Sequence, residues 1–322
     1  MQKLQLSILA VITYFDLFDY PLTSTEVWKY LWHEETTEIE TSEIVSLKSR
    51  DTISLVGIID ELGKLEKEGR VASGNGFYFL PGRETLIKTR NLRHVIAYRK
   101  WRRALRIIRI LRMFPFIRMI AVANTLAYDN ADDGSDIDLF IVTKTERVWT
   151  ARFFVILFLQ LFGLRPNAKT RRDKICACFF VDEDHLDISN LALPGEPDVY
   201  LNYWIATLWP VYNAYGVYEK FFEANAWARK NVPNIHPIIP NVFRRIDRTR
   251  VPLVYKGHPC NSFHESFYRR LQENRFPEEI RSRLNKDTTV IANDHVLKFH
   301  THDRREEYRR KFLERMAVSK YD

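Results

Sequence analysis

The residues best suited to chemistry are two acidic side chains separated by one position, Asp136 and Asp138. They lead into an apolar run, Leu139 to Val142, whose composition predicts a buried strand. Alternate residues of a strand point to the same face, so we expect both carboxylates on one face and Ile137 on the other. Two neighbouring carboxylates repel each other unless a cation lies between them, and hard oxygen ligands suit Mg²⁺ or Mn²⁺.

Such a carboxylate pair has a chemical use and also a simpler explanation. Phosphoryl and nucleotidyl transfer need a cation there, because the charge that builds on the phosphate oxygens and on the leaving pyrophosphate must be neutralised. The simpler explanation makes Asp136 a turn residue and Asp138 an exposed acid at the start of a strand. A lone Asp-x-Asp favours the simpler explanation, so the residues around the pair decide between the two.

The pair belongs to a longer motif, which runs Ser135-Asp136-Ile137-Asp138-Leu139-Phe140-Ile141-Val142. A turn with a hydroxyl residue, Asn124-Thr125, stands ten residues upstream. Together these residues resemble the DNA polymerase β-like nucleotidyltransferase superfamily, whose members carry a Gly-Ser turn, a short helix and then Ser-Asp-x-Asp leading into an apolar strand. Asn124 stands where the family has Gly, Thr125 stands for its Ser, and Ser135, Asp136 and Asp138 match directly.

The resemblance implies a role for each matching position. Asp136 and Asp138 would be the catalytic residues and would ligate the metal ions. Asn124, Thr125 and Ser135 would bind the NTP, with the turn's backbone amides and the Thr125 hydroxyl holding the triphosphate at a helix N-terminus. Asparagine tolerates left-handed backbone geometry better than most residues, although its side chain would narrow the phosphate cradle.

The family also implies a third carboxylate, on a neighbouring strand. The candidate strand, Ile175 to Val181, contains no acid, and the first one after it is Asp182. Simple alternation places Cys176, Cys178, Phe180 and Asp182 on one face, so we expect a cysteine at the position of the third carboxylate. Asp182 serves in this role only if the strand has a different register.

Other metal-ligand candidates are weaker. Cys176 and Cys178 as a zinc pair lack a second Cys or His pair at ligand spacing, and small buried thiols are common in strands. His300, His302 and Asp303 are predicted to form a turn before the last helix rather than a metal site. Five basic residues flank the motif and either contact phosphate or are solvated loop charges: Lys144, Arg147, Arg171, Arg172 and Lys174.

The hydrophobic periodicity predicts an α+β or α/β fold with four regions. Residues 1–82 are expected to form three helices and a hairpin, a pattern that resembles the winged-helix family; its third helix is close to charge-neutral, which favours a structural role over DNA binding. Residues 83–115 form a basic connecting helix. Residues 116–190 form the nucleotidyltransferase core, a mixed sheet flanked by helices, and residues 191–322 form a helical C-terminal region. The whole arrangement resembles a group of bacterial nucleotidyltransferase-domain proteins with a winged-helix-like N-terminal region.

Composition and charge exclude several classes of protein. The 322 residues are 46% apolar and 28% charged, which rules out whole-chain disorder. Three cysteines, Cys176, Cys178 and Cys260, and the absence of a signal-peptide pattern indicate the cytoplasm. The most apolar run, Phe153 to Leu164, is about half the length of a membrane span, so a core helix is expected there and no membrane span.

The basic residues are concentrated in one segment. Twelve Lys or Arg residues and one acid lie between Arg83 and Arg118, whereas the whole chain has a net charge of +8, so the remainder is slightly acidic. A clustered basic stripe favours a polyanion as partner, although a solvated helix face over an acidic site explains it too.

The sequence therefore predicts a Mg²⁺- or Mn²⁺-dependent nucleotidyltransferase that moves a nucleoside monophosphate from an NTP to an acceptor hydroxyl or protein side chain. The missing third acid favours a rival, a catalytically degenerate fold that binds nucleotide or nucleic acid as a regulatory protein. A third interpretation is a nucleic-acid-modifying enzyme whose basic stripe binds the nucleic-acid backbone. Its affinity for nucleic acid must then fall steeply with salt. The acceptor, the preferred base and the oligomeric state are left open.

Overall fold

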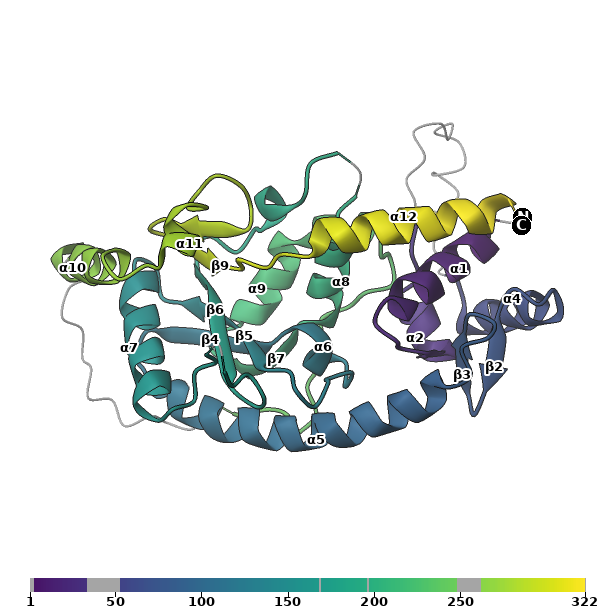
Figure 1. Ribbon diagram of the computed structural model, residues 1–322, viewed down its shortest axis with the longest axis horizontal. Helices are drawn as coiled ribbons and strands as arrows, with labels where there is room; N and C mark the ends of the chain where they lie inside the picture. Colours follow the sequence, from purple (N-terminus) through teal and green to yellow (C-terminus); the bar gives the residue numbers. More distant parts are fainter. Residues whose placement is uncertain (1–2, 34–52, 168, 196, 248–261, 322) are drawn as a thin grey trace.

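The computed structural model describes residues 3–33, 53–167, 169–195, 197–247 and 262–321 (Figure 1). Within these residues, eleven α-helices and two sheets form a mixed α+β fold. Cys260 lies outside the described residues.

The N-terminal region contains the expected three helices and hairpin. The helices are α1 (Lys3–Asp16), α2 (Ser24–Lys29) and α4 (Leu55–Lys67), and the strands β1 (Leu22–Thr23), β2 (Ala72–Gly74) and β3 (Phe77–Phe79) pair in the order β1-β3-β2. Thr23 begins α2 with a capping box, in which its hydroxyl accepts from the Glu26 amide and the Glu26 carboxylate accepts from the Thr23 amide. Asn75 and Gly76 form the hairpin turn with φ values of 51° and 80°, which asparagine and glycine adopt most readily.

The basic segment forms one long helix, α5 (Leu86–Leu111), as expected. Figure 1 shows α5 running along the molecule from the N-terminal hairpin past the central sheet. Apolar residues in its C-terminal half, among them Trp101, Leu105 and Ile108, are buried against the sheet. Leu92 and Val95 in its first half are exposed.

Six strands form the central sheet in the order β7-β4-β5-β6-β9-β8. The first three in the chain are β4 (Ile117–Val122), β5 (Ile137–Thr143) and β6 (Ile175–Asp182), with the short helix α6 (Asn124–Ala127) between β4 and β5 and helix α7 (Val148–Leu161) between β5 and β6. β4 pairs antiparallel with β5, and β5 pairs parallel with β6 across the α7 crossover. The expected strands and the expected core helix are all present.

The C-terminal region is only partly helical. It contains α8 (Val199–Thr207), α9 (Val217–Ala224), α10 (Ser262–Glu273), α11 (Glu278–Arg281), α12 (Arg305–Tyr321) and two 3₁₀ turns, Ser189–Leu191 and Ala226–Lys230. It also supplies β7 (Trp209–Asn213), β8 (Val290–Ala292) and β9 (Val296–Phe299) to the central sheet.

Trp209 lies in the region that was expected to be helical, and at this residue that expectation was wrong. Helix α8 ends at Thr207, and Trp209 begins the edge strand β7. The cause is Pro210, which has no amide hydrogen and cannot continue a helix but is tolerated in an edge strand.

The central sheet separates two hydrophobic cores. Phe140 and Val142 of β5 face a core shared with α1, α2, α4, α8 and α9, whereas Leu139 and Ile141 face a core beneath α5 and α7. Helix α12 packs on α1 and α8 and closes the first core from outside (Figure 1). The N-terminal region therefore belongs to the same hydrophobic core as this face of the sheet, and its aromatic contacts with the rest of the molecule include Tyr128, after α6, and Tyr203 of α8.

Helix α7 contains the most apolar run of the chain and buries Trp149, Val155 and Leu159. None of the described helices combines the length and the apolar composition that crossing a bilayer requires.

Candidate functional site

Asp136 and Asp138 lie where the motif predicts, at the N-terminal end of β5. The Ile137 amide donates to the carbonyl of Lys174 at 2.8 Å, and the Ala123 amide donates to the carbonyl of Asp138 at 3.0 Å, so both neighbouring strands fix this backbone. Ile137 is buried in the core beneath α5. The two half-buried carboxylates therefore share the opposite face, as expected from strand alternation.

A buried lysine anchors the loop that leads into the motif. The Lys100 side chain of α5 is completely buried, and its ammonium donates to the carbonyls of Ser135 (2.6 Å) and Asp133 (3.2 Å). It also pairs with the Asp173 carboxylate at 3.0 Å. The Ser135 hydroxyl donates to the carbonyl of Asp132 at 2.8 Å. Ser135 was predicted to bind nucleotide, and in the structure its hydroxyl stabilises the turn that precedes Asp136.

Asn124 connects the turn to the acid pair. Its backbone has φ 55°, the left-handed geometry that its position predicts. Its amide nitrogen donates to Asp138 Oδ2 at 2.8 Å, and its amide oxygen accepts from the Tyr200 hydroxyl at 3.0 Å. The side chain that replaces the family's glycine therefore contacts the candidate metal ligand itself.

Thr125 lies beside a small cavity between α1, α6 and α8. The cavity has a volume of about 30 Å³ and is lined largely by aromatic rings, including those of Tyr128, Tyr200 and Trp204. Ligand sites usually measure about 300–1,000 Å³, so a nucleotide does not fit there.

The surroundings of Asp138 strongly perturb its pKa. Burial, the Cys178 thiol and the Asp136 carboxylate raise the pKa of Asp138 to about 7, although the Asn124 hydrogen bond opposes this. Asp136 Oδ2 accepts from the Arg171 guanidinium at 3.1 Å. The Arg171 side chain is 69% exposed, so this ion pair is accessible to solvent.

Among the five flanking cations, Arg171 pairs with the acid pair, and the other four have different surroundings. Arg172 pairs with Asp133 at 3.1 Å, Lys174 donates to the carbonyl of Gly163, Arg147 approaches Glu265, and Lys144 is exposed.

The neighbouring strand β6 presents a thiol next to Asp138, as expected. Asp138 pairs with Cys176 across the parallel ladder, and a bulge follows, so that Phe140 pairs with Phe179 instead of Cys178. The bulge changes which face later residues occupy. Phe179 lies in the same core as Phe140, and Phe180 lies in the opposite one. The expectation that Phe180 and Asp182 share a face with both cysteines was therefore wrong.

Asp182 does not complete the acid triad. It pairs with Thr143 at the far end of β5 and is completely buried. Its two oxygens contact the Nδ1 atoms of His185 (2.7 Å) and His295 (2.8 Å), whose rings stack at 3.6 Å. The alternative register that would bring Asp182 to Asp138 is excluded by this pairing.

His300 was predicted to lie in a turn before the last helix, and its contact with Cys178 was not predicted. It follows β9, which lies beside β6, and its Nε2 atom is 2.8 Å from Cys178 Sγ. A hydrogen bond with Cys176 and the His300 ring hold the pKa of Cys178 well below its usual range; the same thiol hydrogen bond and burial raise the pKa of Cys176. Burial lowers the pKa of His300, but Cys178 raises it by more. No local signal marked His300, because the contact spans 122 residues.

His302 lies in the turn before α12, as predicted, and Asp303 follows it. His302 is exposed in a turn, and Asp303 pairs with Lys298 and Arg305 at the start of α12.

No protein-family model matches this chain, and it has no significant match among curated proteins or solved structures. The interpretation of the site therefore depends on its motif and its geometry.

Proposed function

We propose that this chain is a nucleotidyltransferase that moves a nucleoside monophosphate from an NTP to an acceptor hydroxyl or protein side chain. The observation that carries the proposal is the position of Asp136 and Asp138, on one face at the start of β5 and directly after a strand and a short helix. This is the element order that the resembled superfamily uses. Strand β6, beside β5, is where that superfamily has its third acid.

The donor set fits one hard cation. Two carboxylates from one strand edge suit Mg²⁺ or Mn²⁺, and Asp136 lies near enough to Asp138 to raise its pKa. Cys176 stands where a third carboxylate would add oxygen donors, and a thiol is a poor ligand for Mg²⁺. Asp136 and Asp138 would hold the cation, which when bound neutralises charge on the phosphate oxygens.

The surrounding residues position the two carboxylates and can neutralise phosphate charge. Lys100 and Asn124 hold the two ends of the motif through side-chain hydrogen bonds, so the carboxylates need little reorganisation. The Arg171 side chain is largely exposed to solvent, so its guanidinium can leave Asp136 and bind a phosphate oxygen instead. Both described cysteines are free thiols, and a reducing cytoplasm is the setting that the proposal assumes.

The test replaces each aspartate separately. We expect Asp136→Asn and Asp138→Asn each to lower NTP-dependent pyrophosphate release by at least about 100-fold, because transition-state charge is no longer neutralised. Asp60→Asn, an exposed acid on α4, is the matched control and should retain full activity. Undiminished pyrophosphate release in both variants would refute the mechanism.

A specific observation also favours a second function, nucleotide binding without transfer. The thiol at the third-acid position differs from the oxygen ligand that the transfer reaction needs. The second function predicts that labelled NTP binds, and that Asp136→Asn weakens binding, while wild-type protein releases no pyrophosphate with any acceptor.

A further inference from the structure

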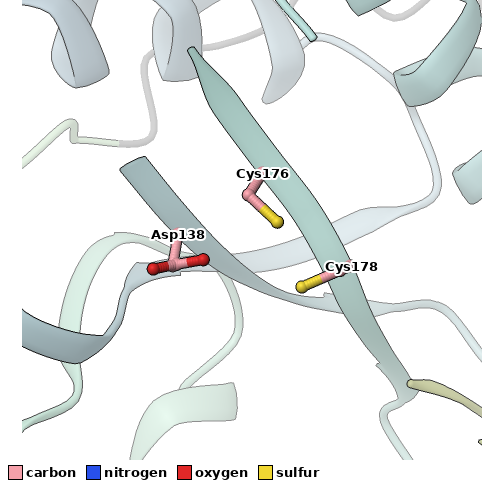
Figure 2. Close-up of side chains that lie close together, drawn as sticks. All are labelled: Asp138, Cys176 and Cys178. Atoms are coloured by element: carbon pink, nitrogen blue, oxygen red, sulfur yellow. The ribbon is translucent and has the colours of Figure 1, made fainter. Parts of the chain in front are cut away.

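Three side chains with metal-ligand atoms converge where β5 and β6 meet. A carboxylate oxygen of Asp138 and the sulfur atoms of Cys176 and Cys178 all lie within 4.8 Å of one another. Figure 2 shows both sulfur atoms on the side of β6 that faces the Asp138 carboxylate. All three residues are half-buried.

The backbone explains why these groups meet. Asp138 and Cys176 are partners in the parallel ladder, which brings their side chains to the same face. Cys178 is two residues further along β6 and shares that face. The bulge that follows Asp138 leaves Cys178 out of the regular pairing, so both thiols stay beside one carboxylate.

A fourth donor comes from a distant strand. His300 Nε2 lies 2.8 Å from Cys178 Sγ, and the His300 amide donates to the carbonyl of Thr289 at 3.0 Å, which fixes the backbone beneath the ring. The ring also meets Phe179 edge to face at 6.1 Å. The imidazole is therefore held against the thiol pair by the β6–β9 pairing.

The chemistry of these four donors selects the ion. Two thiolates, one imidazole and one carboxylate are the ligand types that Zn²⁺ binds tetrahedrally, with metal–ligand bonds of about 2.0–2.3 Å. Mg²⁺ and Ca²⁺ prefer oxygen donors throughout. Three of the four ligand atoms, from Asp138, Cys176 and Cys178, lie within 4.8 Å of one another, and the fourth, His300 Nε2, contacts Cys178 Sγ at 2.8 Å.

We propose that Asp138, Cys176, Cys178 and His300 form a binding site for a thiophilic divalent cation of the Zn²⁺ class. The site goes beyond the proposed transfer reaction and shares only Asp138 with it. Its thiols occupy the place where the resembled superfamily carries its third acid. A thiophilic cation of the Zn²⁺ class would therefore bind where that acid would ligate Mg²⁺.

Cobalt is the probe, because thiolate-bound Co²⁺ has a charge-transfer band and tetrahedral Co²⁺ has intense visible bands. We expect full-length reduced protein, stripped with a chelator, to bind one Co²⁺ with both signatures, and Zn²⁺ to displace it. Cys176→Ser and Cys178→Ser should each weaken the charge-transfer band, and the double variant should abolish it. His300→Ala should keep the band but lower Co²⁺ affinity by about 10–100-fold.

Controls separate this site from its neighbours. His185→Ala and His295→Ala remove the imidazoles around Asp182 and should leave the charge-transfer band unchanged. Asp136→Asn should abolish nucleotide transfer yet keep the band, so failure of the proposed function and failure of the metal site are distinguishable. Bound Zn²⁺ should also protect both thiols from alkylation, a readout that does not depend on variants.

The proposal is overturned if reduced wild-type protein gives no thiolate-to-cobalt band, if the band survives in the double cysteine variant, or if His300→Ala binds Co²⁺ as tightly as wild type. Because a serine variant can also misfold, circular dichroism accompanies each measurement. Zn²⁺ should raise the unfolding temperature of wild type and leave that of the double variant unchanged.

Discussion

At the scale of single residues, Asn124 combines an uncommon backbone conformation with two side-chain hydrogen bonds. It holds a left-handed backbone conformation, donates to Asp138 and accepts from Tyr200. A glycine would adopt the left-handed backbone conformation but would lose both side-chain hydrogen bonds. An alanine would lose the hydrogen bonds and would also be strained, because a Cβ at φ 55° costs about 1–2 kcal/mol. The two substitutions therefore separate backbone geometry from side-chain contact.

We expect Asn124→Ala to lower the free energy of unfolding by roughly 1 kcal/mol more than Asn124→Gly does, since both lose the hydrogen bonds and only alanine is strained. Urea denaturation at pH 7 measures the difference. Tyr200→Phe is the control, because it removes only the hydroxyl that donates to Asn124. Equal losses in the alanine and glycine variants would show that the left-handed geometry is not maintained.

At the scale of secondary-structure elements, buried charges join helices to the sheet. Lys100 ties α5 to the loop before β5, and Asp303 ties the start of α12 to β9 through Arg305 and Lys298. Both side chains of the Lys298–Asp303 pair are less than a tenth exposed. Removal of one partner from such a pair leaves an uncompensated charge, which is costly.

We expect Lys100→Met to lower the free energy of unfolding by roughly 2–3 kcal/mol, because two carbonyls and the Asp173 carboxylate lose a charged donor. Lys88→Met, on an exposed face of the same helix, should change it by less than about 0.5 kcal/mol. Urea denaturation of both variants gives the comparison. A Lys100 effect as small as that of Lys88 would contradict the anchoring role.

The Asp303 pairs predict a pH dependence with a definite sign. Burial raises the pKa of Asp303, but Lys298 and Arg305 together lower it below its ordinary value of 3.8. Its contribution to stability is therefore complete above that value and is lost as the pH falls through the lower, folded-state pKa. We expect Asp303→Asn to cost about 3 kcal/mol at pH 7, with the difference from wild type shrinking below about pH 4. Urea midpoints across this range test it, and a difference that is constant with pH would be the contrary result.

At the scale of the whole molecule, α5 and α12 both connect the N-terminal region to the central sheet (Figure 1). Half of the twelve basic residues in the Arg83–Arg118 segment make internal ion pairs: Arg83, Arg90, Arg93, Arg99, Lys100 and Arg118. Three others, Arg102, Arg106 and Arg109, surround a surface groove on α5. Part of the basic stripe therefore stabilises the fold through internal ion pairs. This makes an extended nucleic-acid-binding surface along the whole stripe less favourable.

We expect duplex DNA to bind only through that groove, with a slope of log affinity against log salt no steeper than about −3, because each phosphate contact contributes about −0.9. Fluorescence anisotropy between about 50 and 200 mM salt measures the slope. Replacement of the three groove arginines by glutamine should remove the salt-dependent binding. A much steeper slope would require basic residues outside the groove to bind DNA as well.

Local periodicity was sufficient to predict several features of the site. The shared face of Asp136 and Asp138, the opposite orientation of Ile137, the left-handed Asn124 and the cysteine beside Asp138 all follow from residue types and strand alternation. The helices α1, α5 and α7 were equally predictable, because their apolar residues recur at helical spacing.

Only the tertiary structure decided which distant residues meet. The bulge after Asp138 changed the faces of Phe180 and Asp182, strand β7 joined the sheet in place of a longer helix, and β9 carried His300 to Cys178. Backbone period determines where a side chain points relative to its own strand. Which strand lies alongside, and in what register, depends on packing between segments more than a hundred residues apart, and no local pattern contains it.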